Sequence, residues 1–321
     1  MKEVDSVRIT TVCENHVDFL LPNVKNATRA GLAFQFDPKH GPLKADNGIS
    51  FHVEAHAGPA KRNVLFEVGF SKGILLHNMN LMDLDPKGLD AILISHGHPD
   101  HCGTIEEVLE AVGRPIAINM HSDAFYPRYV VLADGTTIGP YNYMILNRTK
   151  LEQLGAIFVN NKTAMPLSQG VWASGEIERK VAFEPNRTVD PITRGGLYYV
   201  KDGEFVEDTV PDDQALYINL KGKGLIVLSG CAHAGIINTI EYARKVTGVK
   251  KIHAVLGGTH LGFPGVPEEK VGKTIEALKE IDPDIIVPMH CTGFSAIARM
   301  MRELNSKFIF NVAGTVFDFP G

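Results

Sequence analysis

The sequence is poor in cysteine and has no long apolar run, and each shortage excludes a class of protein. Its cysteines show no CxxC spacing; they are Cys13, Cys102, Cys231 and Cys291. Sparse thiols without a pattern argue against a disulfide framework and are typical of a reducing cytoplasm. No apolar stretch approaches the roughly 20 residues that a helix needs to span a bilayer, and residues 1–6 are polar and lack a signal-peptide core. We therefore expect a cytoplasmic protein without a membrane segment.

An excess of positive charge is also missing. The chain has 32 lysines and arginines against 37 aspartates and glutamates, for a net charge of −5. A dedicated nucleic-acid-binding protein would carry a strongly basic surface. Neither a GxGxxG nor a GxxxxGK[ST] loop is present to hold a nucleotide. The expected partner is therefore a small molecule, and the sequence leaves the oligomeric state open.

Alternating and apolar segments predict strands and helices along the chain. We expect strands at 7–12, 48–55, 63–68, 89–95, 216–220, 224–229, 252–256, 284–288 and 308–312. Helical spacing predicts helices at 104–112, 236–247 and 295–304, and another that begins at Pro267. The segment 120–215 shows no sustained period, and we expect it to supply long connections and the walls of a substrate pocket. Because no Pro/Gly/Ser-rich linker divides the chain, residues 1–321 are expected to form a single domain.

A cluster of metal-ligand residues directly follows the apolar segment 89–95. Residues 95–101 are Ser-His-Gly-His-Pro-Asp-His. Imidazole nitrogens and a carboxylate oxygen suit Zn²⁺, Mn²⁺ or Fe²⁺. His96 and His98 are two residues apart and can bind one ion together, whereas Asp100 and His101 are adjacent and diverge toward a second. The pattern therefore predicts a site for one or two ions, with Zn²⁺ as the first choice.

This run resembles the HxHxDH signature of the metallo-β-lactamase superfamily, and the likeness continues along the chain. The segment 48–69 is similar to the hairpin that opens the superfamily's fold. Three later segments, 229–235, 257–261 and 288–293, are similar to one branch. That branch is named for 7,8-dihydropterin-6-methyl-4-(β-D-ribofuranosyl)aminobenzene-5′-phosphate synthase, an enzyme of methanopterin-type cofactor synthesis. The resemblance implies an α+β fold of the αββα type, in which two β-sheets are flanked by helices.

The resemblance also implies where the remaining ligands stand. His233 follows the expected strand 224–229 and His290 follows the expected strand 284–288, as later ligands of the superfamily do. The expected ligands of a first ion are His96, His98 and His233, and those of a second are Asp100, His101 and His290. His260 follows another strand end and is a candidate ligand, substrate contact or catalytic residue.

The chain departs from the superfamily pattern at two positions. Glu67 replaces the usual aspartate of the hairpin, and we expect it to orient a ligand histidine without binding metal itself. Cys231 stands where many members have an aspartate that bridges two metals. A thiolate can bind zinc, whereas a buried cysteine can equally be inert. One-metal and two-metal sites therefore both remain open.

The expected chemistry is hydrolysis or a related displacement. A metal ion lowers the pKa of bound water from about 16 to about 7. Asp100 would orient the nucleophile or take its proton, and His260 would steady the developing charge. The branch implies a substrate with a pterin and a phosphate, for which Arg128 and Arg187 are the candidate phosphate ligands.

Two other functions fit the same motif less well. A phosphodiesterase or ribonuclease of this fold would need a basic groove, which the net charge of −5 does not favour. A non-catalytic metal-binding sensor would have little reason to keep an open coordination site. A metal-dependent hydrolase-like enzyme is therefore the leading hypothesis.

Overall fold

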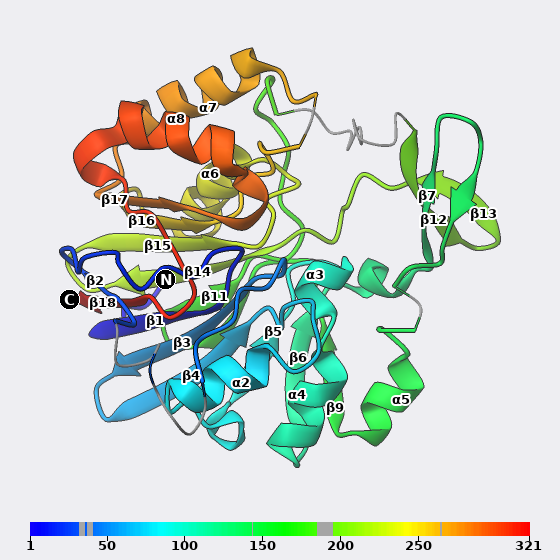
Figure 1. Cartoon of the computed structure of the whole chain (residues 1–321), viewed down its shortest axis with the longest axis horizontal. Helices are drawn as coiled ribbons and strands as arrows, with labels where there is room; N and C mark the ends of the chain where they lie inside the picture. Colours follow the sequence, from blue (N-terminus) through cyan, green and yellow to red (C-terminus); the bar gives the residue numbers. More distant parts are fainter. Residues whose placement is uncertain (32–35, 37–40, 143, 185–194, 264) are drawn as a thin grey trace.

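Two β-sheets packed face to face form the centre of the molecule, and helices cover both outer faces (Figure 1). The computed structural model describes residues 1–321 except 32–35, 37–40, 143, 185–194 and 264. The layer order is the αββα sandwich expected from the sequence. Within the described residues, no helix is both long and apolar enough to cross a bilayer.

The first sheet has eight strands and contains the hairpin predicted near the start of the chain. Its spatial order is β2 (Ala27–Thr28), β18 (Val316–Pro320), β1 (Ser6–Cys13), β3 (Ser50–Ala57), β4 (Ala60–Phe66), β5 (Ala91–Leu93), β6 (Ile116–Met120) and β9 (Ala156–Asn160). Strands β3 and β4 pair from Phe51 opposite Phe66 to Ala57 opposite Ala60, so the hairpin is longer than predicted and its turn is tighter. From β4 onward, β5, β6 and β9 add in parallel.

The second sheet has six strands and is built from the other half of the chain. Its spatial order is β10 (Met165–Ser168), β11 (Val171–Ala173), β14 (Ala215–Leu220), β15 (Gly224–Ser229), β16 (Ile252–Gly257) and β17 (Ile285–Pro288). Strands β15, β16 and β17 are parallel. Their apolar side chains are buried on both faces, as expected for a parallel sheet that lies between another sheet and helices.

Apolar side chains fill three layers of core. The central layer lies between the sheets and contains Phe51 and Phe66 of the first sheet and Leu228 and Leu256 of the second. The first sheet is covered by α2 (Leu75–Leu81), α3 (Pro99–Cys102), α4 (Ile105–Val112) and α5 (Arg148–Gln153). The second sheet is covered by α6 (Ile236–Thr247), α7 (Glu268–Ile281) and α8 (Phe294–Leu304). Short 3₁₀ turns are η1 (Pro86–Gly88), η2 (Ser122–Phe125), η3 (His290–Thr292) and η4 (Asn305–Lys307).

The predicted helix ends are confirmed, with one shift. Helix α4 ends at Gly113 (φ 63°) and α6 at Gly248 (φ 75°), where the left-handed backbone that glycine adopts easily closes the last turn. Pro267 caps α7 from outside the helix and is not its first residue.

The segment 120–215 contains more regular structure than predicted. It forms a third sheet of β13 (Glu204–Glu207), β12 (Gly196–Lys201), β7 (Arg128–Val131) and β8 (Thr137–Ile138). Figure 1 shows this sheet standing beside the sandwich. Strand β7 pairs with β12, which lies far from it in the sequence. A search for local periodicity does not detect such pairing, because each strand is short.

The closing strand predicted at 308–312 is wrong. Phe308 makes only an isolated bridge to Ile286, and the final strand is β18, which pairs with β1. Both segments are apolar and rich in phenylalanine, so composition alone does not distinguish them. The two segments differ in their pairing partner. Strand β1 provides β18 with a continuous row of backbone hydrogen-bonding groups.

Candidate metal centre

The carboxyl ends of parallel strands from both sheets meet at one edge of the sandwich and carry the predicted ligands. Glu67 follows β4, and the run 95–101 follows β5 in the first sheet. Cys231 and His233 follow β15 in the second sheet. His260 and His290 follow β16 and β17 in that sheet. Ring centroids of His96 and His233 lie 4.7 Å apart, which brings the two sheets together at this edge.

Close packing between the two loops requires a glycine. A Cβ atom at Gly230 would lie 2.3 Å from Ser95 Oγ and 2.6 Å from Glu67 Oε1. Both distances are shorter than any tolerable contact, so a side chain here would force the β15 loop away from the β5 loop. The glycine therefore helps to set the separation between ligands of the two sheets.

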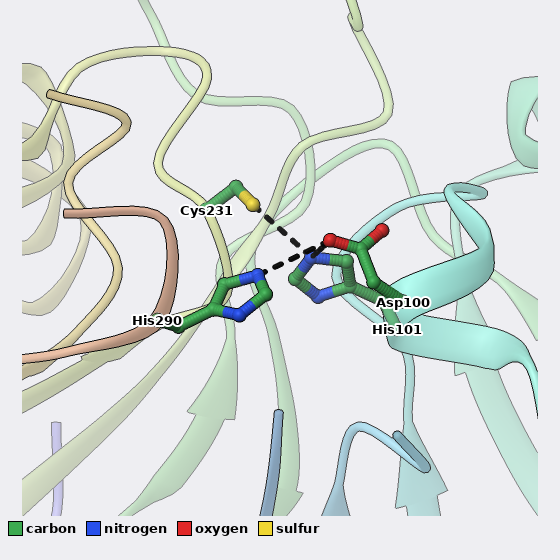
Figure 2. A group of neighbouring side chains, drawn as sticks. All are labelled: Asp100, His101, Cys231 and His290. Carbon is green, nitrogen blue, oxygen red and sulfur yellow. Dashed lines mark hydrogen bonds and ion pairs between the residues drawn. The ribbon is translucent and has the colours of Figure 1, made fainter. Parts of the chain in front are cut away.

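One set of candidate ligands contains a carboxylate, and we call it the acidic group: Asp100, His101, Cys231 and His290 (Figure 2). Asp100 Oδ2 lies 3.2 Å from Nε2 of His290 and 3.5 Å from Nε2 of His101. Nε2 of His101 is also 3.1 Å from Cys231 Sγ. Figure 2 shows the four side chains pointing toward one another from both halves of the fold. This group joins the predicted second-ion ligands with the cysteine whose role the sequence left open.

The other set contains only histidines, and we call it the imidazole group: His96, His98 and His233. Nε2 of His96 lies 3.0 Å from Nδ1 of His98. Nδ1 of His96 is 2.8 Å from Ser95 Oγ, so a hydrogen bond there leaves Nε2 directed at the cluster. Ring centroids of His98 and His233 are 4.9 Å apart. The predicted first-ion ligands are therefore neighbours, and Cys231 also lies within reach of His96 and His233.

Buried ring nitrogens without hydrogen-bond partners support metal binding. Among the described atoms, those lacking a partner include Nε2 of His98, both ring nitrogens of His233 and Nδ1 of His290. An unsatisfied buried polar atom is unfavourable by about 1–3 kcal/mol. A transition-metal ion would satisfy several of these atoms at once. The residues present therefore fit one or two ions of the kind that imidazole, carboxylate and thiolate prefer.

The pKa values of the imidazoles are shifted in opposite directions in the two groups. In the imidazole group, burial lowers the pKa of His98 to about 3 and the pKa values of His96 and His233 well below 6.5. In the acidic group, burial also disfavours the charged ring, but the Asp100 and Glu67 carboxylates outweigh it and raise the pKa of His101 well above 6.5. Asp100 likewise raises the pKa of His290. Burial would raise the pKa of Asp100, but His101 and His290 hold it well below its usual range.

Left-handed backbone conformations are concentrated at this edge. Glu67 (φ 66°), Ala232 (φ 53°), His260 (φ 53°) and His290 (φ 53°) are non-glycine residues in the left-handed region. Such residues are uncommon, and they often occur where function fixes a side-chain direction. At this edge they direct the side chains after three successive strand ends toward the cluster.

Glu67 contacts a candidate ligand through its carboxylate. Its buried Oε1 is 3.4 Å from Nδ1 of His101, and its carboxylate accepts a hydrogen bond from the backbone N–H of Ser95. It therefore contacts both the acidic group and the start of the histidine loop.

Several supporting residues were missed by the sequence analysis. Asp212 accepts a hydrogen bond from the backbone N–H of Gly97, at 2.8 Å, and Asp213 accepts one from Ala234. Glu14 accepts one from the backbone N–H of His290. These carboxylates are buried and lie far from the histidine motif in sequence. Burial is not visible in the sequence, so no local signal could have identified them.

The structure describes one of the two arginines that were proposed as phosphate ligands. Arg128 is fully buried, and its guanidinium forms ion pairs with Asp208 at 3.2 Å and Asp212 at 2.5 Å. The guanidinium of Arg128 is therefore paired with two carboxylates and does not face a solvent-accessible pocket. Because Asp212 also accepts a hydrogen bond from Gly97, Arg128 supports the histidine loop through Asp212. Arg187 lies outside the described residues.

His260 lies at the rim of the cluster with a second cysteine that the sequence analysis did not select. Its ring centroid is 4.2 Å from that of His233 and 4.2 Å from that of Phe263. Its backbone N–H donates to Cys291 Sγ at 3.3 Å. Cys231, His260 and Cys291 form a third set of potential ligands that lie within 4.8 Å of one another.

Comparison with known proteins places these observations in a family. The model of the metallo-beta-lactamase superfamily matches residues 58–290. A relative from Methanocaldococcus jannaschii, named 7,8-dihydropterin-6-methyl-4-(beta-D-ribofuranosyl)-aminobenzene-5′-phosphate synthase, is 30% identical over 319 residues, which is 99% of this chain and 98% of the relative. An uncharacterized protein of the same organism is 31% identical over 85% of this chain and 93% of its own.

Solved structures agree on the fold. A metal-dependent hydrolase of the β-lactamase superfamily superposes with a TM-score of 0.70 at 22% identity, covering 98% of this chain and 100% of its own. A diphosphatase of the PhnP family gives a TM-score of 0.51 at 11% identity, with 98% of each chain covered. The match to the family model, the full-length relative and the shared fold lead to one conclusion: the chain belongs to the metallo-beta-lactamase superfamily.

Proposed function

We propose that this chain is a metal-dependent, hydrolase-like enzyme that activates water at the histidine cluster. The observation that carries the proposal is the set of buried imidazole nitrogens that have no partner within the described structure and face a carboxylate and a thiol. A purely structural cluster would leave these polar atoms unsatisfied, which is unfavourable.

The ligand sets divide naturally between two positions. His96, His98 and His233 would hold one ion, because their rings are neighbours, and Asp100, His101 and His290 would hold another. Cys231 lies within reach of His96 and His233 and also of the second set. Zn²⁺ fits this mixture best, and Mn²⁺ or Fe²⁺ are alternatives. An ion bound there would lower the pKa of a water molecule from about 16 to about 7 and polarise a substrate oxygen.

The protein's own groups would prepare and guide the attack. Asp100 is the part-exposed member of the acidic group, with 33% of its side chain accessible, so its carboxylate is placed to accept a hydrogen bond from the attacking water. His260 is also part-exposed and would donate to the oxygen on which negative charge develops. Glu67 holds the His101 ring in position from behind.

The proposed substrate is a small molecule with a pterin and a phosphate. The support is the full-length relative at 30% identity, whose printed name describes a dihydropterin joined to a ribofuranosylaminobenzene phosphate. The name describes a synthase, so the reaction class to test includes displacement at the sugar phosphate as well as hydrolysis. Because Arg128 is paired with two carboxylates, Arg187 remains the candidate cation for the phosphate.

The first test is a metal count combined with activity. Protein purified without a chelating tag would be analysed for Zn, Mn and Fe by mass spectrometry, alongside His98→Ala and a surface control, His56→Ala. His56 pairs with Glu54 on the β3 strand and lies outside the candidate ligand sets. Wild type and control should carry one or two ions, and His98→Ala should lose about one ion per chain.

Activity then decides the substrate class. Wild-type protein loaded with the identified metal should turn over pterin–phosphate substrates, and His98→Ala should be slower by at least about 100-fold. Turnover of phosphodiesters or RNA alone would replace the substrate proposal with the phosphodiesterase alternative. Absence of bound metal after reconstitution with all three ions would refute the enzyme proposal itself.

A further inference from the structure

A third set of potential ligands lies beside the two predicted groups and has a different composition. Cys231, His260 and Cys291 come from the loops after β15, β16 and β17, and each offers an atom within 4.8 Å of the others. Cys291 Sγ approaches the backbone oxygen of Cys231 at 3.6 Å, and the backbone N–H of His260 donates to Cys291 Sγ at 3.3 Å. Two sulfurs and one imidazole form a softer donor set than three histidines or a carboxylate with histidines.

Backbone hydrogen bonds fix the three loops relative to one another. Gly258 N donates to Gly230 O at 2.9 Å, which ties the β16 loop to the β15 loop. Gly262 N donates to Cys291 O at 3.0 Å and Met289 N donates to Gly257 O at 3.1 Å, which tie the β16 loop to the β17 loop. The donors are therefore held in place before any ligand binds, which is what a specific site requires.

A glycine lets the β16 loop pass close to Cys291 and to the β15 loop. A Cβ atom at Gly258 would lie 2.6 Å from Cys291 Sγ and 3.3 Å from the Cα atom of Cys231, so a side chain here would displace one of these residues. Nδ1 of His260 is buried and has no hydrogen-bond partner among the described residues. Cys231 is buried whereas Cys291 and His260 are part-exposed, so the set is open on one side. A small ion can therefore reach the donors, and an unsatisfied nitrogen is available to bind it.

We propose that Cys231, His260 and Cys291 form a binding site for a thiophilic metal ion, of the class of Zn²⁺, Cd²⁺ or Co²⁺. This site goes beyond the proposed function and shares Cys231 with both predicted groups. An imidazole has two ring nitrogens, so ligation of an ion by one nitrogen of His260 leaves the other to donate to a substrate. The thiols would favour such ions over Mn²⁺, which prefers oxygen ligands.

The test uses the full-length, metal-stripped and reduced protein, titrated anaerobically with Co²⁺. Thiolate ligation of cobalt gives intense near-ultraviolet charge-transfer absorption, which histidine and carboxylate ligands do not. Wild type should show this absorption, and Cys291→Ser should lose it together with at least about tenfold in affinity for one cobalt ion. Cys13→Ser is the matched control, because Cys13 is a buried thiol outside the three ligand sets, and it should behave as wild type.

The outcomes separate this inference from the proposed function. If wild type binds cobalt without charge-transfer absorption, or if Cys291→Ser keeps it, the thiol site is refuted and the histidine site stands. The site would also be refuted if Cys231→Ser lost the absorption and Cys291→Ser kept it. That result would mean that Cys231 binds cobalt together with the histidine cluster and that Cys291 is not a ligand. If wild type binds no cobalt at all, the proposed function fails as well.

A second measurement avoids substitutions that disturb folding. Wild-type protein is alkylated with iodoacetamide in the presence of Cd²⁺ or Mn²⁺, and modification of Cys291 is followed by mass spectrometry. Cd²⁺ should slow the modification at least about tenfold, since a thiolate bound to metal is a poor nucleophile, and Mn²⁺ should not. Equal rates with and without Cd²⁺ would overturn the proposal.

Discussion

The acidic and imidazole groups use the same side chain in opposite ways. His98 lies among other imidazoles, and burial lowers its pKa to about 3. His101 is fully buried, but two carboxylates outweigh the effect of burial and raise its pKa well above 6.5. The comparison teaches that burial alone does not set the state of a histidine; the neighbouring charge decides. In the metal-free protein, the pKa shifts therefore favour neutral imidazoles in one group and charged imidazoles in the other.

The largest expected effect comes from removing the carboxylate that distinguishes the two groups. Asp100→Asn keeps the shape but removes the charge beside His101 and His290. Metal affinity should fall by about 100-fold or more, and turnover should fall by about 10²–10⁴. Calorimetric metal titration and steady-state kinetics measure these changes. Asp318→Asn, in a surface ion pair with Arg8, is the control. Unchanged affinity in Asp100→Asn would remove Asp100 from the ligand set.

A smaller effect is expected from the groups behind the ligands. Glu67→Gln weakens the contact with His101, and Ser95→Ala removes the contact with His96. Each should reduce metal affinity by about 10–100-fold, with the larger loss for Glu67 because its contact is charged. Metal competition with a coloured chelator would rank the variants. A greater loss in Ser95→Ala would contradict the importance assigned to charge.

The pH dependence of stability should differ in sign between the two groups. The folded pKa of His98 lies below its unfolded value of 6.5, so the unfolded chain binds the proton first as pH falls. Metal-free wild type should therefore lose stability relative to His98→Gln as pH falls from about 6.5 toward 3, by about 1.4 kcal/mol per pH unit.

His290 should show the reverse trend. Its folded pKa is raised, so its contribution is complete below pH 6.5 and is lost as pH rises through the folded value. Metal-free wild type should lose stability relative to His290→Gln as pH rises above 6.5. Urea unfolding across the pH range measures both differences. If the stability difference between wild type and variant did not change with pH for either His98→Gln or His290→Gln, the opposite pH dependence of the two groups would be refuted.

The smallest expected effect is a change in the number of protons released when metal binds. Metal ligands must be deprotonated, so ions entering the acidic group displace protons from His101 and His290, whereas the imidazole group releases none. Calorimetry in two buffers near pH 7 should report proton release in wild type and less release in His290→Gln. Equal release from both proteins would contradict the assignment.

The part of the site that could be predicted from sequence is local in the chain. His96, His98, Asp100 and His101 lie within six residues, so their spacing alone predicts a ligand cluster. His233 and His290 needed the family resemblance, because their approach depends on how the two sheets pack. Asp212, Glu14 and Cys291 gave no local signal, since each reaches the site only through the tertiary fold.

The same distinction explains the fold predictions. Long periodic elements such as α6 and β15 were found, because their buried faces repeat within one segment. Strand β18 was misplaced to 308–312, because two similar segments compete and only pairing with β1 separates them. Arg128 was a candidate phosphate ligand, because nothing near it in sequence shows the two buried carboxylates with which it pairs.

The left-handed backbone at the strand ends has a consequence for engineering. Glu67, His260 and His290 adopt conformations that glycine reaches without penalty and that are unfavourable by roughly 1 kcal/mol or more for other residues. Directed evolution that selects only for heat resistance would therefore favour glycine at these positions and discard side chains that form or contact the candidate ligand sets. A thermostable variant should be sought under a selection that also demands metal retention.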